Sequence, residues 1–227
     1  MPQKPVSVLT QHNDNGRTGA NLNETVLKPS NVDVNGFGKL FSHRVQGRIY
    51  AQPLYVPLVS IKGKGVHNIV LVATMGNWVY AFDADDNAQP LWALQVHPNP
   101  IPAKIFKASF NDVPGTPGNI GVLSTPVIDA KIGTSKQDPS TGTVYLVAAT
   151  YDPDRFQAQP QGAFQHLLYA LDIADGQPRP ALPNRPNPME IRGKRCFEAP
   201  AIGPHSSVSS SGGYCGGALP TASSTFG

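Results

Sequence analysis

The chain has 227 residues, of which 22 are glycine and 23 are proline, well above the usual combined share of about 12%. This many turn-forming residues argues against a helical bundle. Charged residues make up 15% of the chain, apolar residues make up 40% and the net charge is +3, which together argue against a disordered polyelectrolyte, a membrane bundle and a nucleic-acid-binding protein.

The first segment, residues 1–36, is predicted to lie outside the main repeats and to offer a closing strand to the fold. Its start, Met1 to Val6, lacks the apolar block of about 7–15 residues that a secretory signal requires. The sequence by itself therefore favours either a protein that stays inside the cell or a chain that lacks its original start. No apolar run approaches the roughly 18 residues needed to span a bilayer, so no membrane span is expected.

The middle of the chain contains three strand-like blocks that recur in the same order. In the first copy, within residues 37–97, the blocks are Gln52–Val56, Asn68–Thr74 and Asn77–Ala84. In the second copy, within residues 121–183, they are Thr125–Asp129, Val144–Thr150 and His166–Ile173. Self-similarity of this kind indicates one structural unit that occurs twice.

The third block of each copy alternates with the period of two that is typical of a strand. One face of it carries Trp78, Tyr80 and Phe82 in the first copy, and Leu167, Tyr169 and Leu171 in the second. The opposite face carries Val79 and Ala81 in the first copy, and Leu168 and Ala170 in the second. A turn that begins at an aspartate ends both strands, and Leu91–Leu94 is the predicted fourth strand of the first copy.

The two copies differ in length between their second and third blocks. Thr74 and Tyr80 are 6 positions apart, whereas Thr150 and Tyr169 are 19 positions apart. The additional 13 residues lie around Tyr151–Gln165. They are predicted to form a loop between two strands, where an insertion costs little.

Each copy is predicted to form a four-stranded antiparallel meander, and such units stack radially as propeller blades or linearly. The segment Val79–Ala84 with Trp92 after it, and the segment Leu168–Asp172, resemble the repeat of pyrroloquinoline-quinone (PQQ)-type β-propellers. Residues Gln11–Asn21 and Phe37–Tyr55 look like the first blade of large secreted propellers in that superfamily. The resemblance extends over Leu9 to Gly176 and implies an all-β, incomplete propeller located outside the cytoplasm, secreted or periplasmic.

The length of the repeat limits how much of a propeller the chain can hold. Pro53 and Pro126 are 73 positions apart, and closed propellers have at least four blades, so we expect about two blades, near 37–97 and 121–183. Residues 184–227 are rich in glycine and serine and are predicted to form a disordered, low-complexity tail. Because no third blade is recognisable, the sequence favours a fragment or a shift of reading frame after about residue 183.

Cys196 and Cys215 are the two cysteines of the chain, and both lie in the predicted tail. They are consistent with one disulfide in an oxidising compartment or with two free thiols, and the sequence leaves their redox state open. Without neighbouring cysteine or histidine residues they do not specify a zinc site.

Two functions are consistent with the resemblance. The first is a non-catalytic propeller fragment with a binding or scaffolding role towards a protein or carbohydrate, with no cofactor in this chain. The alternative is the N-terminal part of a PQQ-dependent alcohol or sugar dehydrogenase, whose full-length parent would carry PQQ and Ca²⁺. Family enzymes commonly stack the quinone between a tryptophan and an adjacent cysteine pair, which this sequence lacks, so Trp78 and Trp92 are predicted to pack between blades.

Propeller geometry places ligands at the ends of the innermost strands and at the loops of one channel mouth. The candidate binding-face residues are therefore Tyr50, Gln52, Ser124 and Thr125. Gln52 and Thr125 have a simpler alternative role, which is to satisfy neighbouring backbone groups. Two open blades would also leave strand edges unpaired, so self-association is predicted.

No metal site is expected from the sequence. Asp83–Asn87 begins like a calcium loop, but Ala88 and Leu94 stand where an EF-hand loop needs glycine and glutamate, so a solvated hairpin turn is predicted. The six histidines lack the paired spacing of metal ligands. They are His12, His43, His67, His97, His166 and His205.

Overall fold

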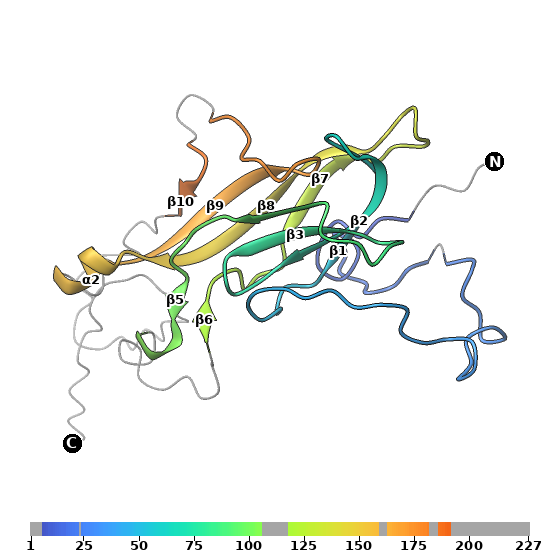
Figure 1. Cartoon of the computed structure of the whole chain (residues 1–227), viewed down its shortest axis with the longest axis horizontal. Helices are drawn as coiled ribbons and strands as arrows, with labels where there is room; N and C mark the ends of the chain where they lie inside the picture. The colour runs from blue at the N-terminus through green and yellow to red at the C-terminus, as the bar shows by residue number, and fades with distance from the viewer. Residues whose placement is uncertain (1–5, 23, 106–117, 159–162, 182–185, 192–227) are drawn as a thin grey trace, which may run out of the picture.

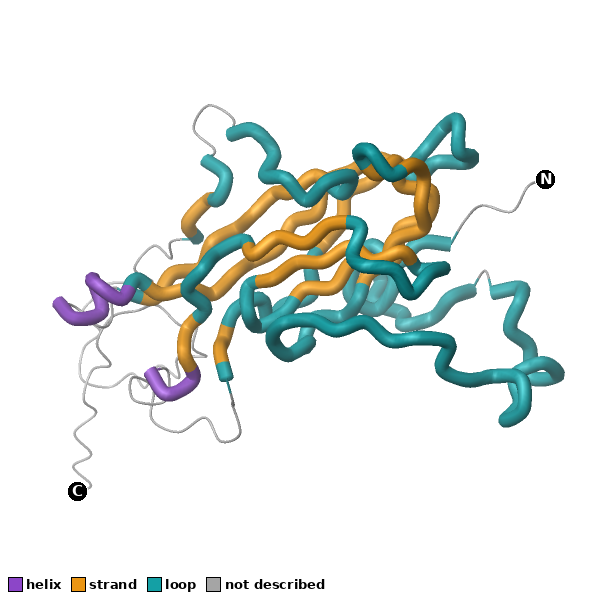
Figure 2. Tube along the Cα trace, in the orientation of Figure 1, coloured by secondary structure: helices purple, strands orange, loops and turns teal. Residues whose placement is uncertain are grey.

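The structure is a computed structural model that describes residues 6–22, 24–105, 118–158, 163–181 and 186–191. These residues form three antiparallel sheets, two of four strands and one of two. The longest strands lie close to parallel to one another in Figure 1, and strands with loops make up most of the trace in Figure 2. The mostly β class predicted from the sequence is confirmed.

The first sheet is a meander of four consecutive strands in the order β1-β2-β3-β4. The strands are β1 (Leu54–Ile61), β2 (Gly65–Ala73), β3 (Trp78–Asp83) and β4 (Trp92–Gln95). All three sequence blocks of the first copy thus contribute a strand, and the predicted fourth strand is present one residue later than expected. The predicted four-stranded antiparallel meander is confirmed for this copy.

The second sheet has the order β10-β9-β8-β7, which is again a meander. Its strands are β7 (Val127–Lys131), β8 (Thr141–Tyr151), β9 (Phe164–Asp172) and β10 (Met189–Glu190). The connection between the two large sheets contains a small sheet of β5 (Ile101–Pro102) and β6 (Asn119–Ile120), which the sequence did not indicate.

Strand β10 lies in the segment that the sequence assigned to a disordered tail. The side chain of Asn187 positions it by donating to the carbonyl of Ala170 at 2.7 Å and accepting from the Ala170 N–H at 3.1 Å. Ile191 then donates its N–H to the carbonyl of His166 at 2.8 Å. For residues 186–191 the predicted disorder is therefore wrong, whereas the rest of the predicted tail lies outside the described residues.

The insertion in the second copy lengthens strands β8 and β9 as well as the loop that connects them. Tyr151 pairs with Phe164, and helix α2 (Pro153–Ala158) follows β8. Asp152 caps this helix, since its Oδ1 accepts the N–H groups of Asp154 and Arg155, each at 3.0 Å. The expectation of a plain loop missed this helix because a single capped turn has no sequence periodicity.

The N-terminal residues contribute a short bridge between the two large sheets. Val8 exchanges two backbone hydrogen bonds with Tyr55 of β1, each 2.9 Å long. The carbonyl of Leu9 accepts the N–H of Ile128 of β7 at 2.8 Å. Of the predicted closing strand in residues 1–36, only this bridge is seen among the described residues.

The main hydrophobic core lies between the two large sheets. We call the side of each sheet that faces the other its core face, and the opposite side its outer face. The core face of the first sheet includes the fully buried side chains of Leu54, Val56, Ile69, Val79 and Ala81. The core face of the second sheet includes Ile128, Val144, Leu146, Ala148, Tyr169 and Leu171. Burial of these apolar side chains is the main contribution that holds the sheets together.

The two sheets use opposite faces of the repeat to build this core. Tyr80 and Tyr169 occupy equivalent positions of the third block, yet Tyr80 is buried on the outer face of the first sheet and Tyr169 in the core. The first block behaves in the same way, because Leu54 is buried in the core while its equivalent Val127 is 48% exposed. The sheets therefore stack front to back.

A single extended segment covers part of the outer face of the first sheet. We call residues 24–50 the arm. His43 stacks on Phe82 with ring centroids 4.2 Å apart, and the N–H of Gln46 donates to the hydroxyl of Tyr80 at 3.0 Å. Tyr80 in turn lies between Trp78 and Phe82 in a continuous aromatic stack. In Figure 1 the arm runs below the first sheet, on the side away from the second sheet.

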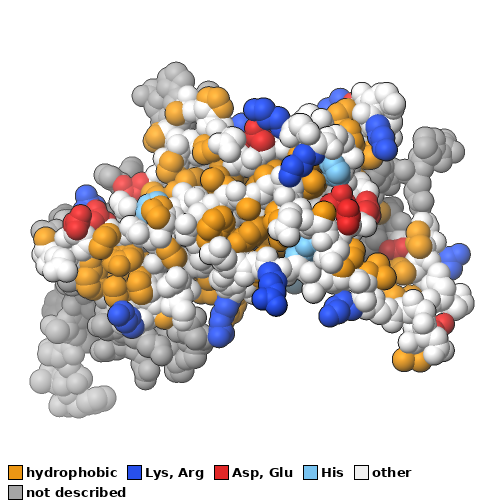
Figure 3. Space-filling model, viewed as in Figure 1, with side chains coloured by type: hydrophobic (Ala, Val, Ile, Leu, Met, Phe, Trp, Pro, Cys, Tyr) orange, Lys and Arg blue, Asp and Glu red, His pale blue; other side chains and the backbone are white. Residues whose placement is uncertain are grey.

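Within the described part of the chain, no helix has the length and apolar character needed to cross a membrane. Lys and Arg side chains are scattered singly over the face shown in Figure 3. On this face they do not form a continuous basic stripe.

Candidate functional site

The structure brings two of the four sequence-predicted binding residues together. The N–H of Gln52 donates to the hydroxyl of Thr125 at 2.9 Å, although the two residues are 73 positions apart. The side-chain Oε1 of Gln52 accepts the N–H of His12, also at 2.9 Å. Both polar side chains therefore satisfy backbone groups, which was the simpler alternative. Tyr50 and Ser124 are exposed, and no hydrogen bond joins either of them to the Gln52–Thr125 pair in the described structure.

The turn between β2 and β3 forms the end of the first sheet that we call the hairpin end. Thr74 and Asn77 are fully buried there, and Asn77 adopts a left-handed conformation with φ of 59°. The side-chain amide of Asn77 donates to the carbonyl of Ala149 at 3.2 Å and so ties this turn to β8. Asparagine tolerates a left-handed backbone better than most residues, which accounts for its position here.

The arm is fastened to the hairpin end by two hydrogen bonds. The hydroxyl of Thr74 donates to the carbonyl of Gln46 at 2.7 Å, and the N–H of Met75 donates to the carbonyl of Arg48 at 2.9 Å. Gly47 lies between these two contacts with φ of +89°, and a Cβ on it would be 2.6 Å from the N atom of Gly76. Only glycine allows this close approach of the arm to the turn.

The second sheet repeats this fastening with equivalent residues. The hydroxyl of Thr150 bonds to Nδ1 of His97 at 2.9 Å, and the N–H of Tyr151 donates to the carbonyl of Asn99 at 3.2 Å. Burial lowers the pKa of His97, which favours the neutral ring whose Nδ1 accepts the bond from the Thr150 hydroxyl. Both second blocks end in Ala-Thr, and nothing in that local sequence indicates that each threonine anchors the preceding segment.

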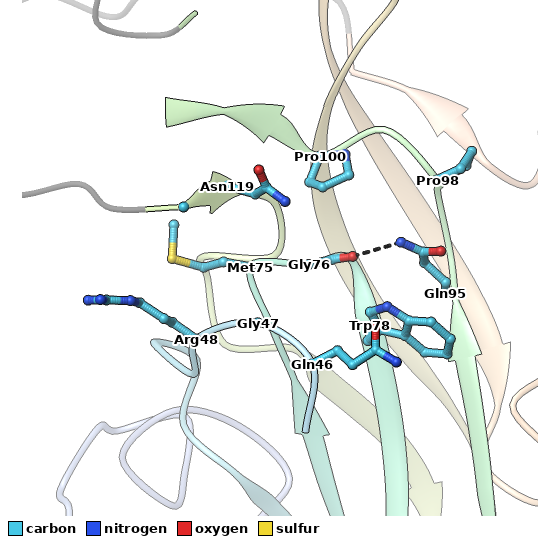
Figure 4. A pocket seen from close by; sticks show the side chains of 11 residues that line it. Gln46, Gly47, Arg48, Met75, Gly76, Trp78, Gln95, Pro98, Pro100 and Asn119 are labelled. Carbon is cyan, nitrogen blue, oxygen red and sulfur yellow. Dashed lines mark hydrogen bonds between the residues drawn. The ribbon is translucent and has the colours of Figure 1, made fainter. Parts of the chain in front are cut away.

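A pocket of about 400 Å³ opens at the hairpin end of the first sheet. The arm contributes Arg48 to it, β3 and β4 contribute Trp78 and Gln95, and β6 contributes Asn119. In Figure 4 the indole of Trp78 lies near the side chain of Gln95, while Arg48 extends past Met75 at the other end. None of the four sequence-predicted binding residues lines this pocket, because it lies between the loops and away from the starts of the inner strands.

The pocket is lined by a cation, an indole and three carboxamides, those of Gln46, Gln95 and Asn119. Gln95 is oriented by donating to the carbonyl of Gly76 at 3.2 Å. Arg48 is exposed and belongs to none of the four ion pairs found among the described residues. None of the described residues that line the pocket is Asp or Glu, so its charge is positive. Such a set can bind hydroxyl and carboxylate groups beside an apolar ring surface.

A second polar cluster joins the start of β2 to the end of β3, at the opposite end of these central strands from the hairpin end. Nδ1 of His67 lies 2.6 Å from Oδ2 of Asp83, and Nε2 donates to the carbonyl of Lys64 at 2.9 Å. The Lys64 carbonyl and the Asp83 carboxylate raise the pKa of His67, because both hydrogen bonds favour the charged ring. Burial acts to raise the pKa of Asp83, but hydrogen bonds from the Asp85 N–H and from His67 lower it below its ordinary value.

The predicted turn at Asp83–Asn87 connects β3 to β4, as a hairpin turn should. Asp83 accepts the N–H of Asp85 at 2.9 Å, and the side chain of Asn68 donates to Asp85 at 2.8 Å. These carboxylates therefore hold the turn and the neighbouring strand. The described residues contain no group of three or more His, Cys, Asp or Glu side chains that could hold a metal ion.

The two tryptophans have different roles. Trp92 is buried between the two large sheets, and its Nε1 donates to the carbonyl of Ile173 at 3.0 Å, which confirms the predicted packing between units. For Trp78 that prediction is wrong. Trp78 is half-buried on the outer face, where it stacks on Tyr80 and lines the pocket. Cys196, Cys215 and His205 lie outside the described residues.

A scan against models of protein families and searches of curated proteins and of solved structures found no match to this chain.

Proposed function

We propose that the protein is a non-catalytic binding unit made of two PQQ-repeat-like propeller blades, with its ligand site in the pocket at the hairpin end. The pocket is the observation that carries the binding role. An exposed arginine, an indole and three carboxamides line a volume of about 400 Å³ there, which is within the usual range for small-ligand sites.

The front-to-back stacking of the two sheets supports the propeller part of this proposal. If two like sheets were related by a two-fold axis, equivalent residues would meet in the core. Here Tyr169 is in the core and its equivalent Tyr80 is on the outer face. Stacking that repeats the same contact from one unit to the next is the arrangement of propellers and other repeat folds.

The chemistry of the pocket favours a carbohydrate that carries a carboxylate, such as a uronic acid. Arg48 supplies the cation for the carboxylate, and the side chains of Gln95 and Asn119 supply donors and acceptors for sugar hydroxyls. The indole of Trp78 supplies the apolar surface against which the ring of a sugar packs.

Calorimetric titration of the full chain with glucuronate and with glucose tests this function. We expect glucuronate to bind at least tenfold more tightly, because hydrogen bonds to a charged group contribute about 1.5–3 kcal/mol. Arg48→Gln should remove this preference and leave the folded structure intact, since Arg48 is exposed.

Arg44→Gln is the matched control, because Arg44 is also an exposed arginine of the arm but does not line the pocket. It should bind glucuronate like the wild-type chain. If the wild-type chain binds neither sugar, or binds both equally, the proposed ligand site is wrong.

A further inference from the structure

Large apolar side chains are exposed on two separate parts of the described structure. The first is the outer face of the second sheet together with its edge, where Val127 is 48%, Tyr145 39%, Met189 38% and Ile191 48% exposed. Val127 lies directly opposite Tyr145, so β7 and β8 present one continuous apolar row. A row of this kind on a sheet face is a site for association.

The second part is the arm, on the opposite side of the first sheet. Val34 and Leu40 are more than 90% exposed there, and Phe37 is 59% exposed. In Figure 1 the first sheet lies between the arm and the second sheet. The two exposed parts are therefore at opposite ends of the stack.

Repeat-equivalent positions connect the residues of these two exposed parts with residues of the core between the two large sheets. The outer-face residues Val127 and Tyr145 are the equivalents of Leu54 and Ile69, which pack against the second sheet. Conversely, the outer face of the first sheet carries Tyr80, the equivalent of the core residue Tyr169. The outer face of the second sheet is thus the repeat equivalent of the core face of the first sheet. The outer face of the first sheet is likewise the equivalent of the core face of the second, and these two core faces pack against each other.

The arm provides a second match of the same kind. Leu40–Gln46 aligns with Leu91–His97, which contains β4, and each segment ends in the threonine fastening described above. His43 packs on Phe82, whereas its equivalent Leu94 packs against the core formed by the second sheet. Leu40–Gln46 therefore lies where the outermost strand of a preceding sheet would lie.

We propose that a second copy of this chain docks head to tail, with the outer face of its second sheet against the outer face of the first sheet. Leu40, which is 91% exposed on the arm, then contacts the docked sheet. This inference rests on the propeller part of the proposed function. The contact continues the existing interface, and because it joins two different surfaces it forms rings or open chains of copies.

Light scattering coupled to size-exclusion chromatography, over a concentration series of the full chain, tests the proposal. The wild-type chain should associate as its concentration rises. Leu40→Lys and Tyr145→Lys should each weaken association at least tenfold, because each buries a charge at one side of the contact. Leu22→Lys and Gln137→Lys are matched controls at exposed positions outside the arm and outside the outer face of the second sheet, and both should associate like the wild-type chain.

Mixing the two defective variants separates head-to-tail docking from other association. A Leu40→Lys copy keeps an intact second sheet, and a Tyr145→Lys copy keeps an intact arm. The mixture should therefore form a one-to-one dimer that does not grow further. A wild-type chain that stays monomeric, or a mixture in which no dimer forms, would overturn the proposal.

The same variants distinguish this proposal from the proposed ligand site. Neither Leu40 nor Tyr145 lines the pocket, so glucuronate should bind to both variants as it binds to the wild-type chain. If a variant loses association but still binds glucuronate, the proposed ligand site stands. Intact association without glucuronate binding would refute the ligand site alone.

Discussion

The two large sheets are built from the same repeat but have different surroundings. The first sheet is covered on both sides, by the second sheet on its core face and by the arm on part of its outer face. Among the residues that the structure describes, the second sheet is covered only on its core face, and its outer face leaves Tyr145 39% exposed. The same strand pattern can therefore support a fully packed or a half-open sheet, depending on which segment lies next to it.

The hairpin ends of the two sheets also differ. In the first sheet a tight turn at Met75–Asn77 leaves space for the pocket against the arm. In the second sheet the hairpin is longer, and an edge-to-face cluster of Tyr151, Phe156 and Phe164 supports helix α2 there. The insertion thus places aromatic side chains where the first sheet has an open site.

The largest expected effect comes from the contact between the sheets at Gly176. A Cβ at Gly176 would lie 2.5 Å from the Trp92 ring, and its φ is +71°, so Gly176→Ala should lower the free energy of unfolding by about 3 kcal/mol. Gly63→Ala is the control in the first sheet, because Gly63 has φ of +73° and nothing within 4 Å of its Cβ position. It should cost only about 1 kcal/mol.

Urea denaturation followed by tryptophan fluorescence measures both losses. Equal losses for the two variants would mean that backbone strain alone acts at Gly176. Such a result would contradict the close contact between Gly176 of the second copy and the ring of Trp92.

A smaller effect is expected at the two equivalent threonines. Thr74→Val leaves the carbonyl of Gln46 without its partner and should cost about 2 kcal/mol, with weaker glucuronate binding because the arm positions Arg48. Thr150→Val should cost about 1 kcal/mol, because Nδ1 of His97 still accepts the N–H of Asn99. Calorimetry should show unchanged glucuronate binding for Thr150→Val. The arm would have no role in the pocket if both variants bound the ligand equally well.

The smallest effect concerns the ion pair of the first sheet. In Asp83→Asn the pKa of His67 should fall towards its ordinary value but stay above it, because the Lys64 carbonyl still accepts from Nε2. Chemical shifts of the imidazole protons over a pH series measure this. Asp86→Asn, an exposed change in the same turn, is the control and should leave the titration of His67 unchanged.

The same pair predicts a pH window for its contribution to stability. The raised pKa of His67 gives a contribution that is complete below the unfolded pKa, about 6.5, and is lost as the pH rises through the folded value. The lowered pKa of Asp83 gives a contribution that is present above its unfolded value, about 3.9, and is lost on acidification. The difference in stability between the wild-type chain and Asp83→Asn should therefore be largest between about pH 4 and 6.5. A difference that does not vary with pH would contradict the ion pair.

Several parts of the site and fold were not predictable from the sequence. The strand β10 is only two residues long and is held by Asn187 through contacts with Ala170, so no local pattern marks it. The pocket is formed by the arm, a turn and the loop after β4, which are distant in sequence. The binding residues inferred from propeller geometry, such as Gln52, were instead engaged with backbone groups.

The sequence by itself determined the three strand blocks of each copy, the alternation of their faces and the aspartate turns that end β3 and β9, because these depend on neighbours within a few residues. Only the tertiary structure decided which face of each copy became core. Tyr80 and Tyr169 have nearly the same local sequence, but one packs beneath the arm and the other between the sheets. The period of a strand defines two faces and leaves their partners unspecified, because those partners are brought together only when distant segments pack.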